Sequence, residues 1–456
     1  MNSSILSGKT YFIRTFGCQM NLHDSERVSG LLDSLGCLEV GEPSDADIVI
    51  FMTCCVREAA DTRLYGQCSS CKSLPKPPSG RRVIAVGGCI AQRDGEGLLT
   101  NLDNVDVIFG THSIAHVGEL IAQAFEDGDH HVRCEEIEDK GATSMPWHRA
   151  TAFHSWVPIM TGCNNFCSYC IVPYVRGREK SRPFEQIVDE VAGLVRSGVR
   201  EITLLGQNVN SYGRDIFGKP RFADLLRAVG ETGIERIRFT SSHPKDLLPE
   251  TINAMADVPA VMPHLHLAVQ SGSTRVLKEM NRRYTREQYI DLVRSIREKI
   301  PGIALTTDII VGFPGETEED FQDTLSMIRR VNFVASYSFC YSPRPGTRAA
   351  LFPDKIDKQT KTDRLERLQA LQEELGVRWL KGRVGSTTEV LLEQPSPRQD
   401  VDGLGSWQGR DPYGALIHVA LPAGRDYTGR LLRVSITGAK KHSLTGSPLA
   451  DGGNLQ

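Results

Sequence analysis

The feature that most constrains the fold is a regular alternation of strand-length apolar runs and helical stretches over residues 152–341. Strands joined by helical crossovers run parallel, and their helices cover the sheet. Six such strands suit a partial, six-stranded β/α barrel better than a complete eight-stranded one. Thr285 with Gln288, and Thr317 with Asp320, have the spacing of capping boxes at two helix starts. The expected strands are 156–161, 201–205, 236–240, 264–269, 304–311 and 336–341, and the expected helices are 184–195, 222–229, 250–256, 287–300 and 319–331.

The residues before and after this alternation differ from it. The first part of the chain repeats the strand–helix alternation over a shorter length, which indicates a second parallel sheet covered by helices. Residues 126–150 lose periodicity and are interpreted as a linker. A charged helix is expected at 359–375, and from Val384 short strand patterns broken by Gly, Pro and Asp indicate a small all-β module. The expected N-terminal strands are 11–16, 47–52 and 82–86, with helices at 24–35 and 114–125, and the expected C-terminal strands are 388–392, 415–420 and 431–436.

Length and composition limit the location and the partners of the chain. Its 456 residues suggest more than one domain, and its formal net charge of −3 means that any nucleic-acid binding must use local basic surfaces. The N-terminus lacks the apolar core of a secretion signal, and no apolar run reaches the ~18 residues that cross a bilayer. We therefore expect a soluble cytoplasmic protein. Its 12 cysteines are then expected to act as buried apolar side chains or metal ligands rather than as disulfides.

Three closely spaced cysteines follow the first strand of the central alternation, as Cys163-x3-Cys167-x2-Cys170. Three thiolates can hold three irons of a 4Fe-4S cluster, which leaves the fourth iron open for a small molecule. The loop leaves the carboxyl end of a strand, where barrel enzymes place their chemistry. The alternative is a zinc site completed by a distant fourth ligand. Zinc motifs usually pair their cysteines, however, and no second pair follows in this region.

A second set of cysteines, Cys18, Cys54 and Cys89, is spread along the N-terminal region but repeats one pattern, because each follows a strand-length apolar run. The carboxyl ends of parallel strands meet at one edge of a sheet, which is where open α/β sheets bind ligands. The pattern favours a second three-thiolate site over three unrelated buried cysteines. The glycines that adjoin these cysteines, and that permit a close approach of the backbone, are Gly17, Gly87 and Gly88.

The residues around both cysteine sets resemble a known family. Cys-x3-Cys-x-Tyr-Cys on a β/α barrel resembles the radical S-adenosylmethionine (SAM) superfamily, and the run from Ile171 to Arg182 is similar to its methylthiotransferase branch. The block Thr15-Phe-Gly-Cys-Gln-Met-Asn resembles the tRNA methylthiotransferases that modify N6-isopentenyladenosine. The resemblance runs from about Thr10 to Gly446, and its supporting blocks begin at Gly206, Ser241, Gln270, Asp308 and Tyr341.

The resemblance implies an α/β fold class with three domains. These are an N-terminal Rossmann-like parallel α/β domain at 8–126, a central partial (β/α)6 radical SAM barrel at 149–380, and a small C-terminal all-β TRAM-type barrel at 381–448 that binds RNA. The implied activity is that of a radical SAM methylthiotransferase, which inserts sulfur and a methyl group at carbon 2 of N6-isopentenyladenosine next to the anticodon in tRNA.

The cofactors implied by the resemblance are SAM and two 4Fe-4S clusters. Cys163, Cys167 and Cys170 would hold the SAM-binding cluster, and Cys18, Cys54 and Cys89 would hold an auxiliary, sulfur-donating cluster. No catalytic side chain is expected beyond these ligands, because an aromatic C–H bond offers no acidic proton and the cofactors must carry the chemistry. The residues expected to contact SAM are Gly206, Gln207, Asn208, Gln270, Ser271, Asp308 and Gly312.

The expected partners are the tRNA anticodon stem-loop and an external electron donor, with no membrane and a monomeric chain. A basic stretch just after the central cysteines is interpreted either as a solvated loop or as an RNA contact. A second basic patch lies in the C-terminal module. The two groups are Arg176, Arg178, Lys180 and Arg182, and Arg430, Arg433, Lys440 and Lys441.

Two alternative functions are considered. The first is a related methylthiotransferase for threonylcarbamoyl-adenosine in tRNA or a ribosomal-protein aspartate, which the Phe-Gly-Cys-Gln-Met-Asn block disfavours. The second is a non-catalytic iron–sulfur RNA-binding or electron-transfer protein, which would need four ligands per cluster.

The remaining cysteines support weaker expectations. Cys55 is expected to point away from Cys54, and Cys68-x2-Cys71 has weak metal-binding or redox spacing. Three cysteines are expected to act only in packing: Cys37, Cys134 and Cys340. Two positions hold a residue other than the one common in the family that the chain resembles: Met52 and Ala268.

Overall fold

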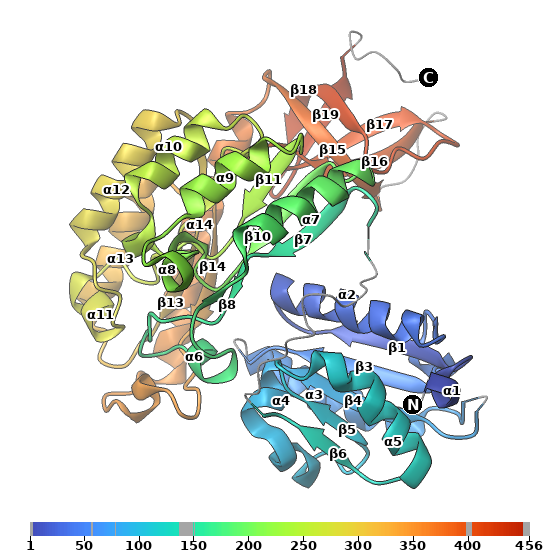
Figure 1. Cartoon of the computed structure of the whole chain (residues 1–456). Helices are drawn as coiled ribbons and strands as arrows, with labels where there is room; N and C mark the ends of the chain where they lie inside the picture. Colours follow the sequence, from blue (N-terminus) through green and yellow to red (C-terminus); the bar gives the residue numbers. More distant parts are fainter. Residues whose placement is uncertain are drawn as a thin grey trace. The chain divides into compact units, whose positions relative to one another are not determined.

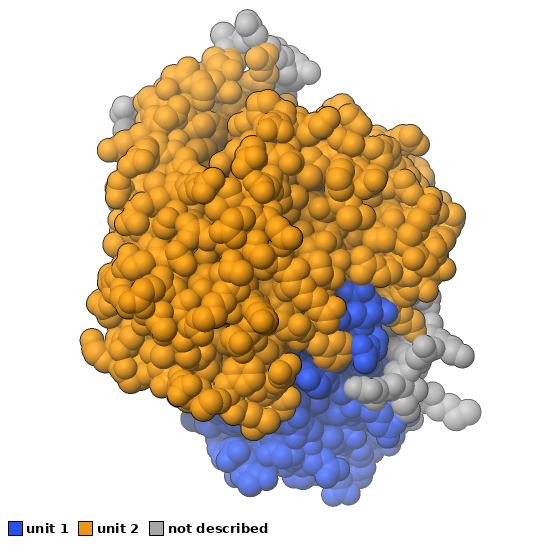
Figure 2. All heavy atoms as spheres, turned by 90° about the vertical axis from the view of Figure 1, so that its left-hand side faces the viewer, with its two compact units in different colours: residues 1–150, 161–164, 170–179 blue, residues 151–160, 165–169, 180–456 orange. Residues whose placement is uncertain are grey.

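The computed structural model describes residues 3–55, 58–77, 79–135, 149, 151–397 and 404–449 (Figure 1). The chain divides into two compact units, drawn in different colours in Figure 2. Unit 1 comprises residues 1–150, 161–164 and 170–179, and unit 2 comprises residues 151–160, 165–169 and 180–456. Each unit is described by itself. In the described part of the chain, no helix combines the length and apolar character needed to cross a membrane.

Unit 1 is built on a six-stranded parallel sheet. Its strands are β1 (Thr10–Thr15), β2 (Leu38–Glu39), β3 (Ile48–Thr53), β4 (Val83–Gly88), β5 (Val107–Phe109) and β6 (His131–Arg133), in the order β2-β1-β3-β4-β5-β6. The three N-terminal strands expected from the sequence are confirmed as β1, β3 and β4, which are neighbours. The interpretation of 126–150 as a linker is wrong at its start, because β6 pairs with β5. Three half-buried residues are too few to show periodicity, and residues 136–148 lie outside the described part.

Helices cover both faces of this sheet. They are α1 (Ser3–Leu6), α2 (Gln19–Ser34), α3 (Glu58–Ser70), α4 (Cys89–Asp94), α5 (Val117–Asp127) and the single turn α6 (Val172–Val175). On one face, Val28 of α2 and Ile121 of α5 pack with Ile50 of β3. On the other face, Leu64 of α3 packs with Phe51 of β3. The side chains of β3 alternate between two apolar cores, as expected for a parallel strand buried on both sides.

Unit 2 contains the expected partial barrel. Its strands are β7 (His154–Pro158), β10 (Glu201–Leu205), β11 (Arg236–Phe239), β12 (His264–His266), β13 (Ala304–Val311) and β14 (Ala335–Cys340). They form two three-stranded parallel sheets, β11-β10-β7 and β12-β13-β14, which are joined by the bridges Ile237–Val261 and Ser242–Leu267. The six strands predicted from the sequence are therefore confirmed, and a complete eight-stranded barrel is excluded for the described residues. A further short pair consists of β8 (Met160–Thr161) and β9 (Lys180–Ser181).

The five helices expected between the barrel strands are confirmed as α7 (Phe184–Arg196), α9 (Phe222–Gly230), α10 (Pro249–Asp257), α12 (Arg286–Lys299) and α13 (Glu318–Val331). Two short helices were not expected, α8 (Arg214–Phe217) and α11 (Thr274–Glu279), and the charged helix α14 (Lys358–Lys381) follows the last barrel strand. Both capping boxes are present, with Thr285 capping α12 and Thr317 capping α13. Short 3-10 helices lie at Pro43–Asp45, Cys71–Ser73, Gly95–Thr100, Ile114–His116, Val209–Ser211, Pro244–Asp246 and Arg348–Leu351.

The C-terminal module of unit 2 is a closed five-stranded barrel. Its strands are β15 (Thr387–Pro395), β16 (Leu404–Arg410), β17 (Leu416–Pro422), β18 (Leu431–Ala439) and β19 (Leu444–Pro448), in the order β15-β16-β17-β19-β18. Helix α14 continues past the expected end at residue 375, and its Trp379 and Leu380 pack into the core of this barrel. The domain boundary at 380 stays a prediction. Arg236 and Arg238 of β11 donate to the carbonyls of Arg410 and Asp411, so the two barrels are hydrogen-bonded to each other.

Candidate functional site

Three cysteines follow the carboxyl ends of adjacent strands in unit 1. Cys18 follows β1 and is the N-cap of α2, Cys54 follows β3, and Cys89 begins α4 directly after β4. Because β1, β3 and β4 are neighbours in a parallel sheet, these positions share one edge. The side chain of Cys18 hydrogen-bonds that of Cys54 and is electrostatically coupled to Cys89. The thiols therefore lie close together, as the strand-end pattern predicted.

A fourth thiol belongs to this group. Cys55 was expected to point away from Cys54, but its side chain hydrogen-bonds Cys89, so the expected direction of this side chain is wrong. The bond to Cys54 lowers the pKa of Cys18 to about 6, and the bond to Cys55 lowers the pKa of Cys89 to about 7. The same bond and burial raise the pKa of Cys55. Cys18 and Cys89 are thus biased toward thiolate, the form that binds metals.

Glycines shape the strand ends beside these thiols. Gly88 has φ 92°, and a Cβ there would lie 2.5 Å from the Thr53 carbonyl oxygen. Gly17 has φ 149°, and a Cβ there would lie 2.4 Å from the Cβ of Cys54. A Cβ at Gly87 would overlap the ring of Phe109. Glycine at positions 17 and 88 therefore allows the ends of β1, β3 and β4 to approach one another this closely, and glycine at 87 leaves room for the Phe109 ring of β5.

The segment after the central cysteine motif supplies a buried cation to unit 1. Arg176, at the end of α6, donates through Nη2 to Asp24 Oδ2 at 2.8 Å, and its side chain also hydrogen-bonds Cys89. The possibility that Arg176 is an RNA contact is therefore wrong, because the residue is only 6% exposed. Arg182 is likewise engaged internally, with Glu190 at 2.6 Å. Arg178 and Lys180 remain exposed.

The three central cysteines are anchored to different units. Cys163, whose backbone N–H donates to Gly177 O at 3.2 Å, and Cys170 belong to unit 1. Cys167 belongs to unit 2, where Arg282 Nη1 approaches its sulfur to 3.6 Å. Sequence reasoning missed Arg282, because 115 positions separate it from Cys167 and only the barrel brings the two together.

Arg282 is held tightly in unit 2. It is 4% exposed, its Nε donates to the Tyr284 hydroxyl at 2.9 Å, and its Nη2 donates to the carbonyl of Ala268. The alanine side chain at position 268, which differs from the residue common in the family, therefore does not affect this contact, because Arg282 bonds only the backbone carbonyl. Although burial acts to lower it, the pKa of Arg282 is raised well above its usual value, with contributions from Tyr284, Tyr169 and Cys167. A permanent cation thus faces the Cys167 sulfur.

Residues expected to contact SAM at the end of β10 have unsatisfied polar atoms. Gln207 Oε1 and Asn208 Oδ1 are buried and have no hydrogen-bond partner among the described residues. Asn208 Nδ2 donates to Asp246 Oδ2 at 2.8 Å, which fixes the orientation of the amide. Buried polar atoms are nearly always paired, so these two acceptors fit a bound polar ligand. Gly206 packs against Met160, where a Cβ would lie 2.7 Å from Cγ.

The other expected SAM contacts have varied roles. Gln270 has φ 70°, which is unusual for a side-chain-bearing residue and is common near functional sites. Ser271 is fully buried and accepts from the Ser273 N–H at 3.2 Å. Gly312 has φ 68°, and its N–H donates to Glu316 Oε1 at 2.9 Å. Ser271 and Gly312 are therefore accounted for by the turns they stabilise.

Asp308 lies in a polar group on the strands β12, β13 and β14. His266 Nε2 is 3.2 Å from Asp308 Oδ2, and Asp308 is the register partner of Tyr337. The Tyr337 and His266 rings are 5.9 Å apart, and Tyr337 is 55% exposed although it lies within a strand. Asp308 is partly exposed, whereas Leu305 and Ile309 of the same strand, β13, are fully buried. His266 and Tyr337 were not anticipated, because neither stands in a recognisable motif.

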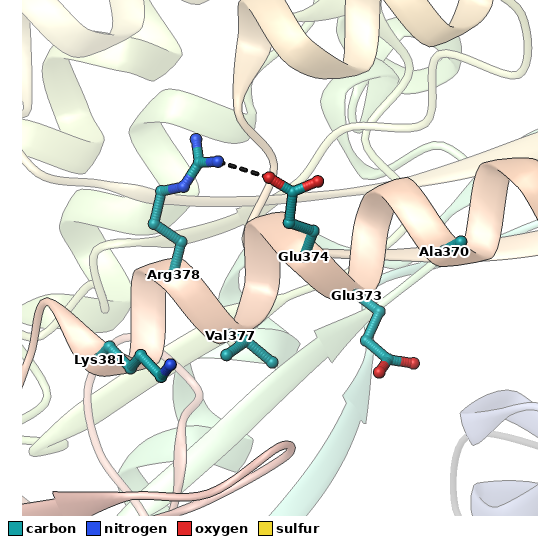
Figure 3. Close-up of a pocket in the computed structure, with 6 residues that line it drawn as sticks. All are labelled: Ala370, Glu373, Glu374, Val377, Arg378 and Lys381. Carbon is teal, nitrogen blue, oxygen red and sulfur yellow. Dashed lines mark hydrogen bonds and ion pairs between the residues drawn. The ribbon is translucent and has the colours of Figure 1, made fainter.

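A groove of about 550 Å³ lies along α14, away from all of these residues (Figure 3). Glu374 and Arg378 form a 2.6 Å ion pair on one side of the helix, and Glu373 projects from the other side and pairs with Lys441 at 2.8 Å. Because its lining comes from one helix, the groove is an open surface feature and provides no cofactor site. It is lined by Ala370, Glu373, Glu374, Val377, Arg378 and Lys381.

The donor sets suit iron–sulfur clusters better than hard metal ions. Each consists of thiols, the ligands that hold such clusters, and each has a buried arginine beside it. Within the described ranges, no group of three or more His, Cys, Asp or Glu side chains has a ready metal-binding arrangement. The four N-terminal thiols instead hydrogen-bond in pairs.

Comparisons with known proteins agree with these features. A family model described as "Radical SAM superfamily" matches residues 157–328, and one described as "Uncharacterized protein family UPF0004" matches residues 10–110. The chain is 45% identical over 439 residues to a protein named tRNA-2-methylthio-N(6)-dimethylallyladenosine synthase from Streptomyces avermitilis, covering 96% of this chain and 86% of that one. A relative of the same name from Acetivibrio thermocellus is 46% identical over 442 residues, covering 96% and 91%.

Solved structures show the fold independently of close sequence similarity. The radical S-adenosylmethionine methyltransferase TsrM from Kitasatospora setae, solved with cobalamin and a [4Fe-4S] cluster bound, superposes with a TM-score of 0.52 at 14% identity. The superposition covers 88% of this chain and 81% of that one. The likeness supports the α/β architecture of the chain.

Proposed function

This chain belongs to the family of the tRNA-2-methylthio-N(6)-dimethylallyladenosine synthases, and we propose on that basis that it methylthiolates carbon 2 of N6-isopentenyladenosine in tRNA. It is a radical SAM enzyme that transfers sulfur-containing groups to tRNA. The single observation that best supports the residue assignments is the grouping of cysteine thiols at the ends of the adjacent strands β1, β3 and β4. A separate three-cysteine motif follows the first barrel strand.

We assign the SAM-binding 4Fe-4S cluster to Cys163, Cys167 and Cys170, and an auxiliary 4Fe-4S cluster to Cys18, Cys54 and Cys89. When bound, the two clusters would supply the electron for SAM cleavage and the sulfur, and SAM would supply the methyl group. The protein holds the thiols as ligands and places a guanidinium beside each set, which stabilises the negative charge of the thiolates. The unsatisfied oxygens of Gln207 and Asn208 would accept hydrogen bonds from SAM.

We assign the target base to the exposed face of β12, β13 and β14. Tyr337 offers an exposed ring on which a base can stack, and such stacking contributes about 1–3 kcal/mol. The Asp308 carboxylate, which contacts His266 Nε2 at 3.2 Å, would accept a hydrogen bond from the edge of an adenine, a role that replaces the SAM contact expected from the sequence. An adenosine beside an anticodon must leave its stack to reach this face, as in other enzymes that act on bases.

The proposal includes the anticodon stem-loop of tRNA as the partner and an external protein as the electron donor. The closed C-terminal barrel would bind the RNA backbone. Arg430, Arg433 and Lys440 are exposed on it, whereas Lys441 pairs with Glu373. We further propose that the chain acts as a monomer in the cytoplasm.

The test is reaction of anaerobically reconstituted protein with SAM, reductant and tRNA that carries N6-isopentenyladenosine. We expect 5′-deoxyadenosine and the 2-methylthio nucleoside, both detected by mass spectrometry. Replacing Cys163, Cys167 and Cys170 by Ala should abolish both products. Replacing Cys18, Cys54 and Cys89 should abolish the nucleoside product while 5′-deoxyadenosine still forms.

A matched control is Cys340→Ser, because this partly exposed cysteine belongs to neither set. The control should retain both products. Modification of threonylcarbamoyl-adenosine instead of isopentenyladenosine would contradict the substrate assignment. Absence of 5′-deoxyadenosine with the unaltered protein would favour a non-catalytic iron–sulfur protein.

A further inference from the structure

Arg176 is a buried cation in a position that its sequence context does not suggest. It follows Cys170 of the central motif by a single helical turn, and both residues belong to unit 1. The side chains of Arg176 and Asp24 are only 7% and 5% exposed, and they form a 2.8 Å ion pair. Removing a guanidinium from water is costly, so its position requires compensating negative charge.

Asp24 supplies only part of that negative charge. The Arg176 side chain also hydrogen-bonds Cys89 and is electrostatically coupled to Cys18. The thiols of Cys89 and Cys18 are therefore the other groups that can supply negative charge beside the buried guanidinium.

The backbone fixes this cation in place. Ile171 and Val175 are buried in the apolar core that contains Leu64 and Phe51. The Thr111 hydroxyl donates to the Val175 carbonyl at 2.7 Å, and the Arg176 N–H donates to the Val172 carbonyl at 2.9 Å. The guanidinium therefore has little freedom to leave the thiols when their charge changes.

We propose that Arg176 is a positioning residue that raises the reduction potential of the cluster held by Cys18, Cys54 and Cys89, and that Asp24 opposes it. The inference rests on the proposed auxiliary cluster. Adding an electron makes a cluster with thiolate ligands more negative, so a fixed neighbouring cation stabilises the reduced form more than the oxidised form. A fixed neighbouring carboxylate has the opposite effect. The loop that carries the central motif thus also adjusts the chemistry of the second thiol set.

The test is an anaerobic redox titration followed by electron paramagnetic resonance. The full chain with Cys163, Cys167 and Cys170 replaced by Ala is the background, so that only the N-terminal cluster can form. Arg176→Gln should lower the potential by an amount that changes the reduced-to-oxidised ratio at least tenfold, which corresponds to about 59 mV. Arg176→Lys should stay near the parent value, and Asp24→Asn should shift the potential upward.

Arg282→Gln is the matched control, because Arg282 is an equally buried arginine that contacts Cys167 in unit 2. It should leave the potential of the N-terminal cluster unchanged. In the complementary background, with Cys18, Cys54 and Cys89 replaced by Ala, Arg282→Gln should shift the potential of the remaining cluster and Arg176→Gln should not.

Equal potentials for Arg176→Gln and its parent would overturn the inference. A downward shift for Asp24→Asn as well would also overturn it, because both substitutions would then act by loosening the site. If Arg176→Gln loses its iron, the reduction potentials of Arg176→Lys and Asp24→Asn decide whether the inference holds. Absence of iron from the parent background itself would contradict the proposed auxiliary cluster, and the inference with it.

Discussion

Gly88→Ala tests whether the carboxyl ends of β3 and β4 must lie in close contact for Cys89 to stay near the other thiols. Gly88 has φ 92° and ψ −153°, a region that is essentially restricted to glycine and costs an alanine about 1–3 kcal/mol. Its Cβ would also lie 2.5 Å from the Thr53 carbonyl oxygen, which accepts from Asn21 Nδ2 at 2.5 Å. Relieving that overlap means separating β3 from β4, and overpacking of this kind costs about 1–3 kcal/mol. We expect a total loss of about 2–6 kcal/mol and a shift of Cys89 away from the other thiols.

The assay is hydrogen exchange of β3 and β4 peptides, together with iron analysis of the reconstituted protein. The matched control is Gly80→Ala, because Gly80 has φ 82° with nothing within 4 Å of an added Cβ. It should lose only about 1–2 kcal/mol and keep its full iron content. Gly88→Ala should keep only about half of the iron, that of the central cluster. Equal exchange and equal iron in the two variants would refute the reasoning.

Four further outcomes are expected. Glu316→Gln removes the charge that balances Arg364 in a buried 2.7 Å pair, so urea unfolding should show a loss of about 3–5 kcal/mol; adding Arg364→Met should restore most of it. Burial lowers the pKa of His154 from 6.5 to about 4, so the unfolded chain binds the proton first and stability should fall from pH 6.5 to pH 4, by about 3 kcal/mol; a flat urea midpoint over that range would contradict this. Tyr337→Ala should weaken stem-loop binding by about 5- to 150-fold in fluorescence anisotropy, whereas Tyr337→Phe should not. Cys55→Ser should retain the full iron content, since Cys55 is not among the proposed ligands; loss of iron would make it one.

The sequence was sufficient for features that repeat along the chain. The barrel strands and the capping boxes at Thr285 and Thr317 were predicted because hydrophobic period and cap chemistry are local. The convergence of Cys18, Cys54 and Cys89 was predicted because parallel strands end on one edge. Strands β16 and β19 were missed, since Gly405, Gly409 and Gly446 interrupt their apolar pattern. Helix α14 runs through a glycine at position 376 because its last turn packs into the C-terminal barrel.

Contacts that join distant segments could not be predicted from the sequence. The pairing of Arg176 with Asp24 spans 152 positions, and that of Arg282 with Cys167 spans 115. In the sequence, Arg176 looked like any member of a basic stretch, and its burial depends on α6 packing into the N-terminal core. The hydrogen bond between Cys55 and Cys89 was missed for the same reason, because the turn after a strand decides where the next side chain points.

The most direct test of the account is the iron and acid-labile sulfide content of anaerobically prepared protein, measured for the parent chain and for the two triple-cysteine variants. We expect two clusters in the parent and one in each variant, with SAM cleavage only where Cys163, Cys167 and Cys170 are intact. A parent that holds zinc without iron would contradict it. An iron content that does not change when Cys18, Cys54 and Cys89 are replaced would contradict the auxiliary cluster.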